Sequence, residues 1–410
     1  MRSRLAGHPA TLVAAFVLVH VWLAVINLYW APDGMTDVTG VYRRWMVAGF
    51  EQGSWVGIDQ PWVYPIVALV PMVLAYAVAG HDLFPVAWLV LVAVVDLVAL
   101  AMLLRAGHRR GAWGWTVFLF ALGPIAVGRI DAITVPLVVI GLTVLARRPV
   151  VAGVLIVVAT WIKVWPVAVV AAIVIASSQR AKVIIGAVGA SVVIIGVALV
   201  LGAGANIASF VTSQTARSLQ IEAPVTTLWM WAASLHLGDA QVYFDRDIIT
   251  YQVTGEGVAL AASLMNPLLL LAVVATLVLG WRAQRRGAEP IDLVLVLSTA
   301  LIAALIVFNK VGSPQYVAWF AAPLVLALIV QRYSVLVRAV LVIAVLTQLI
   351  YPYLYFAVVA VHPAAIALLT VRNVLLVALF VWTVVRLAKL GHEPREERLR
   401  TGGLRRGEQL

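Results

Sequence analysis

Residues 9–30 read PATLVAAFVLVHVWLAVINLYW, and residues 31–45 then read APDGMTDVTGVYRRW. The first stretch is apolar and long enough to cross a bilayer, which takes about 20 residues. No small-residue cleavage site follows it, so we expect an uncleaved first helix. Asp37 lies directly after this helix, at the membrane exit. A carboxylate in that place is suited to be the catalytic base of an enzyme that uses lipid-linked sugars.

Composition also indicates a protein that crosses the membrane. The 410 residues are 63% hydrophobic and 11% charged, and the mean hydropathy is +1.03. A soluble domain does not bury so much apolar surface, so we predict an all-α, polytopic membrane protein. The chain has no cysteine, which excludes disulfides and thiolate metal sites.

The net charge of +11 comes from short basic runs between apolar segments rather than from one nucleic-acid-binding patch. Such runs mark the cytoplasmic side of a membrane protein. They lie at residues 1–8, 105–110, 147–148, 179–182, 282–286, 332–338 and from 386 onward. This pattern predicts a plasma-membrane protein of about twelve crossings, with both termini cytoplasmic. We expect one transmembrane domain over 1–386 and a charged, disordered cytoplasmic tail over 387–410.

Two large loops, residues 31–63 and 202–258, are predicted on the outer side. The apolar run from Tyr64 to Gly80 lies between the first loop and a helix at about 83–104. If it crossed the membrane, the basic run at 105–110 would lie outside, against the charge rule. We therefore interpret it as a re-entrant or tilted segment that begins and ends on the outer side.

Residues 113–146 and 150–177 are each too short for two full spans. Polar residues lie at their centres, around Arg129 and Asp131 in the first and Lys163 in the second. Each block therefore predicts a hairpin of two short helices with a polar tip. Irregular backbone at membrane depth survives only inside protein or beside a watery cavity, so both tips are expected to line a cavity that opens outward.

Eight charged or amide side chains fall on this predicted outer side or on the outward-facing hairpin tips, and ionisable groups near the membrane are costly and usually functional. One carboxylate among several cations suits transfer of a group from a phosphate-linked lipid to a hydroxyl. The carboxylate takes the proton of the acceptor, and the cations neutralise the departing phosphate. A Gly-rich nucleotide loop is absent, which argues against a nucleotide-sugar donor. The set is Asp37, Arg129, Asp131, Lys163, Arg217, Glu222, Lys310 and Gln315.

The proposed base has simpler interpretations. Asp37 also fits a solvated loop carboxylate or a helix N-cap. Asp33 and Asp59 share its loop, and Asp59 is the alternative base.

The cations have simpler interpretations too. Arg129 and Asp131 fit a structural ion pair at a hairpin tip, and Arg217 and Glu222 fit another pair. Lys163 fits a snorkelling lysine, and Lys310 an interfacial anchor.

Other polar residues lie within the apolar spans. Asp96 and Arg372 are expected to pair with each other, and His20 to be a hydrogen-bonded core histidine. Three tyrosines at 351, 353 and 355 fit an aromatic belt first and a sugar platform second. The seven histidines show no metal-binding spacing, so neither a metal nor another cofactor is predicted.

The chain resembles the polyprenol-phosphate-mannose-dependent mannosyltransferases of glycosyltransferase family 87, in the integral-membrane GT-C class. The resemblance spans roughly residues 10–385. Its marks are Asp37-Val-x-x-Val-Tyr42, Gln60-Pro-Trp-Val-Tyr64-Pro65, Gly128-Arg129-x-Asp131, Arg147-Arg-Pro149 with Lys163 and Pro166, Arg217-Ser-Leu-Gln220-Ile-Glu222 and Ser313-Pro-Gln315-Tyr316 with Trp319. Many relatives carry Gly-Gln-x-Asn in place of the third mark and Tyr-Pro-Pro where this chain has Tyr64-Pro65-Ile66. These departures concern the identity of donor or acceptor more than the class of reaction.

The resemblance implies an inverting transfer of mannose from polyprenyl-phosphate mannose to a glycolipid or glycan hydroxyl, with Asp37 as the base. It implies a phosphate clamp and a set of substrate contacts. The clamp candidates are Arg129, Lys163, Arg217 and Lys310. The substrate contacts are Tyr42, Tyr64, Asp131, Gln220, Glu222, Gln315 and Tyr316.

Two other functions remain possible on the sequence. One is an arabinofuranosyl or other transferase with a polyprenyl-phosphate donor, since the shape of the pocket decides the sugar. The other is a glycolipid transporter or flippase, which predicts inverted repeats or polar groups at both faces. The polar groups gather on one side, which favours catalysis there.

Overall fold

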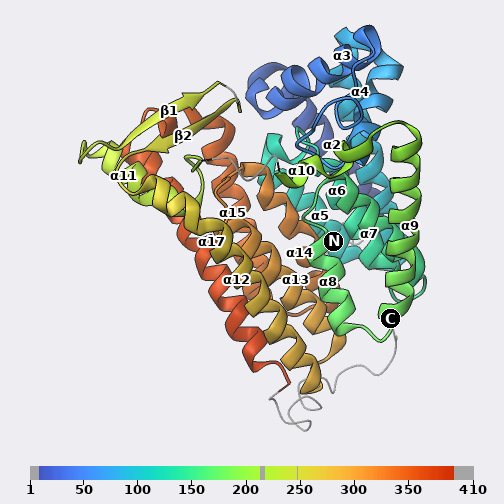
Figure 1. The fold of residues 1–410 in the computed structure, drawn as a ribbon. Helices are drawn as coiled ribbons and strands as arrows, with labels where there is room; N and C mark the ends of the chain where they lie inside the picture. Colours follow the sequence, from blue (N-terminus) through green and yellow to red (C-terminus); the bar gives the residue numbers. More distant parts are fainter. Residues whose placement is uncertain (1–8, 213–217, 247, 392–410) are drawn as a thin grey trace.

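The computed structural model describes residues 9–212, 218–246 and 248–391, and it is almost entirely helical (Figure 1). Within these described residues, seven helices are long and apolar enough to cross a membrane. They are α2 (Pro9–Val25) with η1 (Ile26–Trp30), η4 (Ile66–Ala68) with α4 (Leu69–Arg105), α9 (Arg180–Val200), α12 (Val258–Arg285), α13 (Pro290–Val307), α15 (Ser334–Gln348) with η9 (Leu349–Tyr353), and α17 (Pro363–Lys389). These helices confirm a polytopic membrane protein.

Shorter helices fill the space between the long ones. Four are apolar: α6 (Asp131–Val144), α7 (Pro149–Ile162), α8 (Val167–Ala176), and η8 (Pro314–Phe320) with α14 (Ala321–Val330). The predicted number of about twelve crossings is not established by these lengths and stays a prediction. Helix α17 runs on to Lys389, and most of the predicted tail lies outside the described residues.

Both predicted helical hairpins are present. The first consists of α5 (Arg109–Leu122), the 3-10 turn η5 (Gly123–Ala126) and α6, and the second of α7 and α8. Helices of 14 residues are about 21 Å long, less than the roughly 30 Å of a bilayer core. Gly128 is required at the first tip, because a Cβ there would collide with the carbonyl oxygen of Gly34.

Helix α4 contains a sharp break at Gly80. Gly80 has φ 65° and ψ −165°, a conformation that glycine adopts without a steric cost. The helical stretch from Leu69 to this break spans only about 17 Å, so it is too short to cross the membrane alone. This length agrees with the interpretation of residues 64–80 as a segment that does not span.

Helix α13 forms the centre of the bundle. It is buried along nearly its whole length and packs against α8, α12 and α17. Helices α7 and α9 approach each other closely at two glycines, since a Cβ on Gly153 would meet the backbone of Val183, and one on Gly186 the backbone of Val150. Small residues at such contacts are how membrane helices pack without a hydrophobic driving force.

The all-α prediction missed a small sheet in the second large loop. Strands β1 (Gln241–Asp245) and β2 (Thr250–Thr254) pair antiparallel, with Gln241 opposite Thr254. Both strands carry β-branched and aromatic residues, which favour a pleated surface. The polarity of this stretch concealed that pattern.

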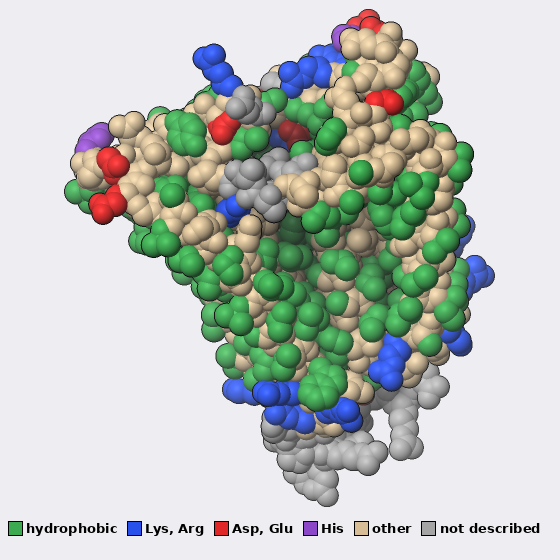
Figure 2. All heavy atoms as spheres, viewed as in Figure 1, with side chains coloured by type: hydrophobic (Ala, Val, Ile, Leu, Met, Phe, Trp, Pro, Cys, Tyr) green, Lys and Arg blue, Asp and Glu red, His purple; other side chains and the backbone are tan. Residues whose placement is uncertain are grey.

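We call the end of the bundle that carries β1 and β2 the sheet end. Helix α3 (Arg43–Gln52) lies at this end too (Figure 1). Figure 2 shows that most Lys and Arg side chains of the visible face gather at the opposite end. The remaining short elements are η2 (Pro32–Met35), η3 (Asp37–Tyr42), η6 (Gly204–Ala208), α10 (Ser209–Thr212), η7 (Pro224–Thr226), α11 (Thr227–Ser234) and α16 (Tyr355–Val359).

The expected Asp96–Arg372 pair is wrong. Asp96 Oδ2 lies 3.0 Å from His20 Nε2, and His20 Nδ1 lies 3.0 Å from the Phe16 carbonyl oxygen. A carbonyl only accepts, so Nδ1 carries a proton, and one further proton joins the imidazole to the carboxyl. His20 is thus a hydrogen-bonded core histidine, as expected, and Arg372 pairs with Glu222 instead.

Replacement of His20 tests this buried contact. His20→Leu leaves the Asp96 carboxyl without its partner among apolar helices, so we expect the free energy of unfolding to fall by about 1–3 kcal/mol. The double variant His20→Leu/Asp96→Leu should recover most of the loss, because an apolar pair leaves no polar group buried. Thermal unfolding in detergent measures both, and a single variant as stable as the wild type would contradict the contact.

Candidate active site

Asp37 begins the π-helical turn η3, which directly follows η2. Its side chain is 30% exposed, and Oδ2 lies 3.2 Å from Nε of Arg129. Thr36, not Asp37, is the residue before the turn, and it makes no capping bond through its side chain. Asp37 is therefore an ion-paired carboxylate with access to solvent, and not an N-cap.

The guanidinium of Arg129 holds this carboxylate in place. Nη1 donates to the carbonyl oxygens of Gly34 (2.5 Å) and Gly128 (3.0 Å). Nη2 donates to Oγ1 of Thr36 (3.1 Å) and Oη of Tyr351 (2.9 Å). With Asp37 on Nε, each of its five N–H groups has an acceptor. Binding of a phosphate by Arg129 would require one of these bonds to break.

A second ion pair lies beside the first. Nζ of Lys163 is 3.5 Å from Oδ2 of Asp131, and Nε1 of Trp319 donates to Oδ1 of Asp131 at 2.6 Å. Nζ also lies 4.8 Å from the ring centroid of Tyr64 and 5.7 Å from that of Tyr316. Lys163 is thus held among aromatic rings, and it does not snorkel. The alternative of an Arg129–Asp131 pair is wrong, because each residue pairs elsewhere.

Two tyrosines connect the ion pairs. Oη of Tyr42 lies 3.5 Å from Oη of Tyr64 and accepts the N–H of Ile130 at 3.2 Å. Burial raises the pKa of Tyr42, and the neighbouring Tyr64 and Asp37 raise it further. Burial also raises the pKa of Tyr64. Both phenols therefore stay protonated at neutral pH.

Aromatic rings form one side of this cluster. Trp165 and Trp319 stack with centroids 5.7 Å apart and an angle of 9° between the planes, and Tyr316 stacks on Trp319 at 4.3 Å. Trp165 Nε1 donates to Oγ1 of Thr134 at 3.0 Å. Stacked rings beside charged groups suit a sugar, which presents both C–H faces and hydroxyls.

The other predicted residues lie outside this cluster or at its edge. Oδ2 of Asp59 accepts the backbone N–H of Trp55 within its own exposed loop, at 2.7 Å. The Lys310 carbonyl accepts the N–H of Gln220 at 3.0 Å, and burial lowers the pKa of the Lys310 ammonium. Gln315 is buried, and Arg217 lies outside the described residues.

Glu222 is joined to the last helix and not to the main cluster. Arg372 Nη1 lies 3.7 Å from Oε2 of Glu222, and Nη2 donates to the Glu222 carbonyl at 2.8 Å. Burial raises the pKa of Glu222 to about 7, against the opposing effects of Arg372 and Arg129.

Sequence reasoning missed the role of Tyr351. It is buried, accepts from Arg129 and donates to the Asp33 carbonyl at 2.6 Å. Because Tyr351 lies at the end of a span, together with Tyr353 and Tyr355, the sequence favoured a role in an aromatic belt. The proline after Tyr351, which stops a regular helix, was the one available signal that this end is irregular.

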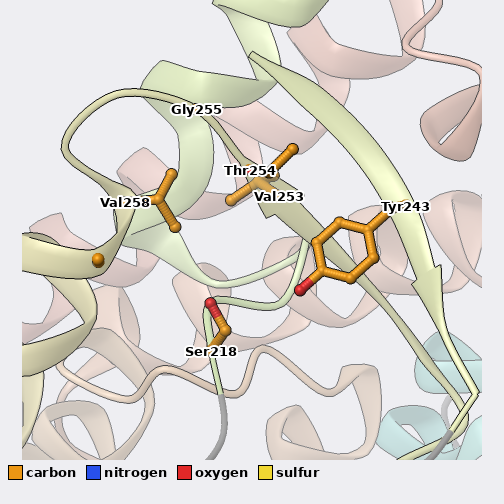
Figure 3. A pocket seen from close by; sticks show the side chains of 7 residues that line it. Ser218, Tyr243, Val253, Thr254, Gly255 and Val258 are labelled. Carbon is orange, nitrogen blue, oxygen red and sulfur yellow. The ribbon is translucent and has the colours of Figure 1, made fainter. Parts of the chain in front are cut away.

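Figure 2 shows the visible face hollowed below the sheet end, with acidic and basic side chains at the upper end of the hollow. Two cavities lie elsewhere. One of about 460 Å³ is lined by residues of β1, β2 and α12 (Figure 3), and the other, of about 610 Å³, by residues of α11 and α17. Neither is lined by Asp37, so the chemistry is assigned from the ion pairs and not from cavity size. Within the described residues, no three His, Asp or Glu side chains are grouped to hold a metal.

The fold and site define a polytopic membrane protein with a carboxylate–cation centre at the tips of two short helical hairpins. The family model of glycosyltransferase family 87 matches residues 62–308, more than half of the chain, and the protein belongs to this family. It is therefore a membrane glycosyltransferase that uses a sugar donor and an acceptor. Comparisons with curated proteins and with solved structures give no match.

The raised pKa of Glu222 predicts how stability depends on pH. The folded value of about 7 exceeds the ordinary 4.5, so the folded state binds this proton more tightly than the unfolded state. The resulting stabilisation is full below about pH 4.5 and is lost as the pH rises through 7. We expect the Tm to fall between pH 5 and 8, and Glu222→Gln to flatten that slope. The exposed Glu256→Gln is the control, and an unchanged slope in Glu222→Gln would contradict the assignment.

Proposed function

We propose that this glycosyltransferase moves a mannosyl group from polyprenyl-phosphate mannose to a hydroxyl of a glycolipid or glycan, with inversion at the anomeric carbon. The observation that carries this proposal is the pairing of a partly exposed Asp37 with a buried, fully bonded Arg129. The family assignment supports the transferase class. The sugar and the lipid carrier rest on the sequence marks.

Asp37 acts as the general base. Among the described residues only its Oδ2 is ion-paired, and Oδ1 remains to accept the proton of the acceptor hydroxyl. The hydroxyl oxygen then forms the new bond to the anomeric carbon. The bond from that carbon to the phosphate oxygen breaks, and its electron pair leaves with the polyprenyl phosphate. Inversion follows from attack on the face opposite the leaving group.

Arg129 positions the base rather than binding the phosphate, since each of its N–H donors already has an acceptor within the protein. Lys163 is the better candidate for the phosphate, because only one contact to a carboxylate holds its ammonium group. Lys310 and Arg217 stay candidates for the same clamp. A cation at the leaving oxygen stabilises negative charge that grows during transfer.

The remaining substrate contacts are assigned by position. Tyr64, Tyr316 and the neighbouring Trp319 offer an aromatic surface to the donor sugar. Tyr42 and Asp131 hold that surface through their bonds. Gln220, Glu222 and Gln315 are proposed on the acceptor side.

The membrane orientation is part of the proposal. Basic side chains gather at the end opposite the sheet (Figure 2), as expected for a cytoplasmic face. The Asp37 centre then faces the extracytoplasmic side of the plasma membrane, with both termini cytoplasmic. A donor held in the membrane reaches such a site without a nucleotide-binding loop.

Asp37→Asn is the direct test of the base. The amide keeps the shape but accepts a proton poorly, so we expect kcat to fall at least about 100-fold. Purified protein in detergent is supplied with polyprenyl-phosphate mannose and a mannosyl-lipid acceptor. Asp59→Asn, in the same loop, should retain activity. If Asp59→Asn abolishes transfer and Asp37→Asn does not, Asp59 is the base.

The same assay with other polyprenyl-phosphate sugars, including the arabinofuranosyl donor, decides the sugar. Transfer from none of them by the wild type would overturn the transferase mechanism proposed here. It would favour a glycolipid transporter.

Substitutions of Lys163 and of Arg129 should change different kinetic constants. Lys163→Met removes a charged contact to the donor phosphate, worth about 1.5–3 kcal/mol, so we expect the KM for donor to rise about 10- to 100-fold. Arg129→Lys keeps the charge but loses most of the bonds that orient Asp37, so kcat should fall with little change in the donor KM. If the KM for donor rises in Arg129→Lys and not in Lys163→Met, then Arg129 binds the phosphate and Lys163 does not.

A further inference from the structure

The cavity beneath the β-hairpin is separate from the Asp37 centre. Its volume is about 460 Å³. Residues from four segments line it: Ser218, Tyr243 of β1, Val253 and Thr254 of β2 with the following Gly255, and Val258 and Ala259 at the start of α12. Figure 3 shows the hydroxyl groups of Ser218 and Tyr243 pointing into the same space.

The lining is polar without being charged. Hydroxyl groups come from Ser218, Tyr243 and Thr254, and apolar walls come from Val253 and Val258. No residue that lines this cavity carries a charge at neutral pH, and burial raises the pKa of the Tyr243 phenol further. The cavity therefore offers hydrogen bonds beside short apolar walls.

The tyrosine is held in this position by one buried neighbour, Gln252. Its Oη donates to Oε1 of Gln252 at 3.1 Å, so the oxygen remains able to accept. Gln252 is 1% exposed, and its Nε2 donates to Oδ2 of Asp245 at 3.1 Å. The hydroxyl is thus fixed before any ligand arrives, which lowers the entropic cost of binding.

The segment from Ser218 to Glu222 joins the cavity to the Glu222–Arg372 pair. Val253 donates its N–H to the Leu219 carbonyl at 3.0 Å, and Gln220 is paired antiparallel with Gln252. This segment continues to Glu222, four residues after Ser218, a reach of at most about 14 Å. Glu222 is one of the residues proposed on the acceptor side of the reaction.

These features select one class of ligand. A phosphate would require cations, and a hydrocarbon chain would form no hydrogen bonds with the hydroxyl groups of the lining. A sugar ring has hydroxyls for the polar groups and C–H faces for the valines. We propose that this cavity binds a neutral sugar unit of the acceptor glycan, remote from the hydroxyl that reacts. The proposal rests on the proposed function, since it assumes a glycan acceptor.

The test is a substitution that fills part of the cavity with a larger side chain from α12. Ala259→Trp places a bulky ring against the lining at the first turn of α12, and Leu260→Trp places the same ring on the adjacent exposed residue, which does not line the cavity. Comparable Tm values for the two variants show that both fold. Tyr243→Phe is a milder second variant, because it removes only the fixed hydroxyl.

Binding is measured without any transfer reaction. Free α-linked mannotriose is added to the full-length protein in detergent, and saturation-transfer NMR reports contact. We expect Ala259→Trp to reduce the signal at least about 5-fold and Leu260→Trp to leave it unchanged. Equal signals in wild type and Ala259→Trp would overturn the proposal.

The second measurement is transfer to acceptors of different glycan length. Ala259→Trp should raise the KM of an acceptor with several mannose units about 10-fold and leave that of a one-mannose acceptor unchanged. An equal KM change for both acceptors would also overturn the proposal. If the wild type transfers no sugar but still binds mannotriose at this cavity, the proposed reaction fails and the binding site stands.

Discussion

The Arg129 guanidinium is the interaction on which the site depends. It joins the loop after the first helix, the tip of the first helical hairpin and Tyr351 near the end of the chain. A buried cation is stable only when its charge and its N–H groups are matched. The same bonds that compensate for the burial of Arg129 therefore fix the position of Asp37.

The short hairpins explain how such a centre exists beside a membrane. Backbone groups at that depth need partners inside the protein, and the first tip finds them in Asn27, which donates to the Pro124 carbonyl, and in Tyr42, which accepts the N–H of Ile130. The two tips bring Arg129 and Lys163 close to two carboxylates. Alternating carboxylates and cations limit repulsion within the cluster, while Asp37 stays open to solvent.

Asp131 and Lys163 were predicted at the two tips, and the structure pairs them. The partners of charged residues within the spans were predicted less well. Asp96 bonds to His20 and Arg372 to Glu222, because which faces of α2, α4 and α17 meet depends on packing. Hydropathy along each helix contains little information about that choice. The β-hairpin was missed because its first strand, β1, alternates only weakly between exposed and half-buried residues.

The sequence by itself determined the membrane class, the short polar-tipped hairpins and the residue types of a carboxylate–cation site. Those properties follow from segment length, charge placement and the cost of polar groups in lipid, which are all local. Only the tertiary structure decided that Arg129 pairs with Asp37 and Lys163 with Asp131, and that Tyr351 accepts a hydrogen bond from Arg129. Such partners lie up to 318 residues apart along the chain, and the packing of whole helices, not any local pattern, brings them together.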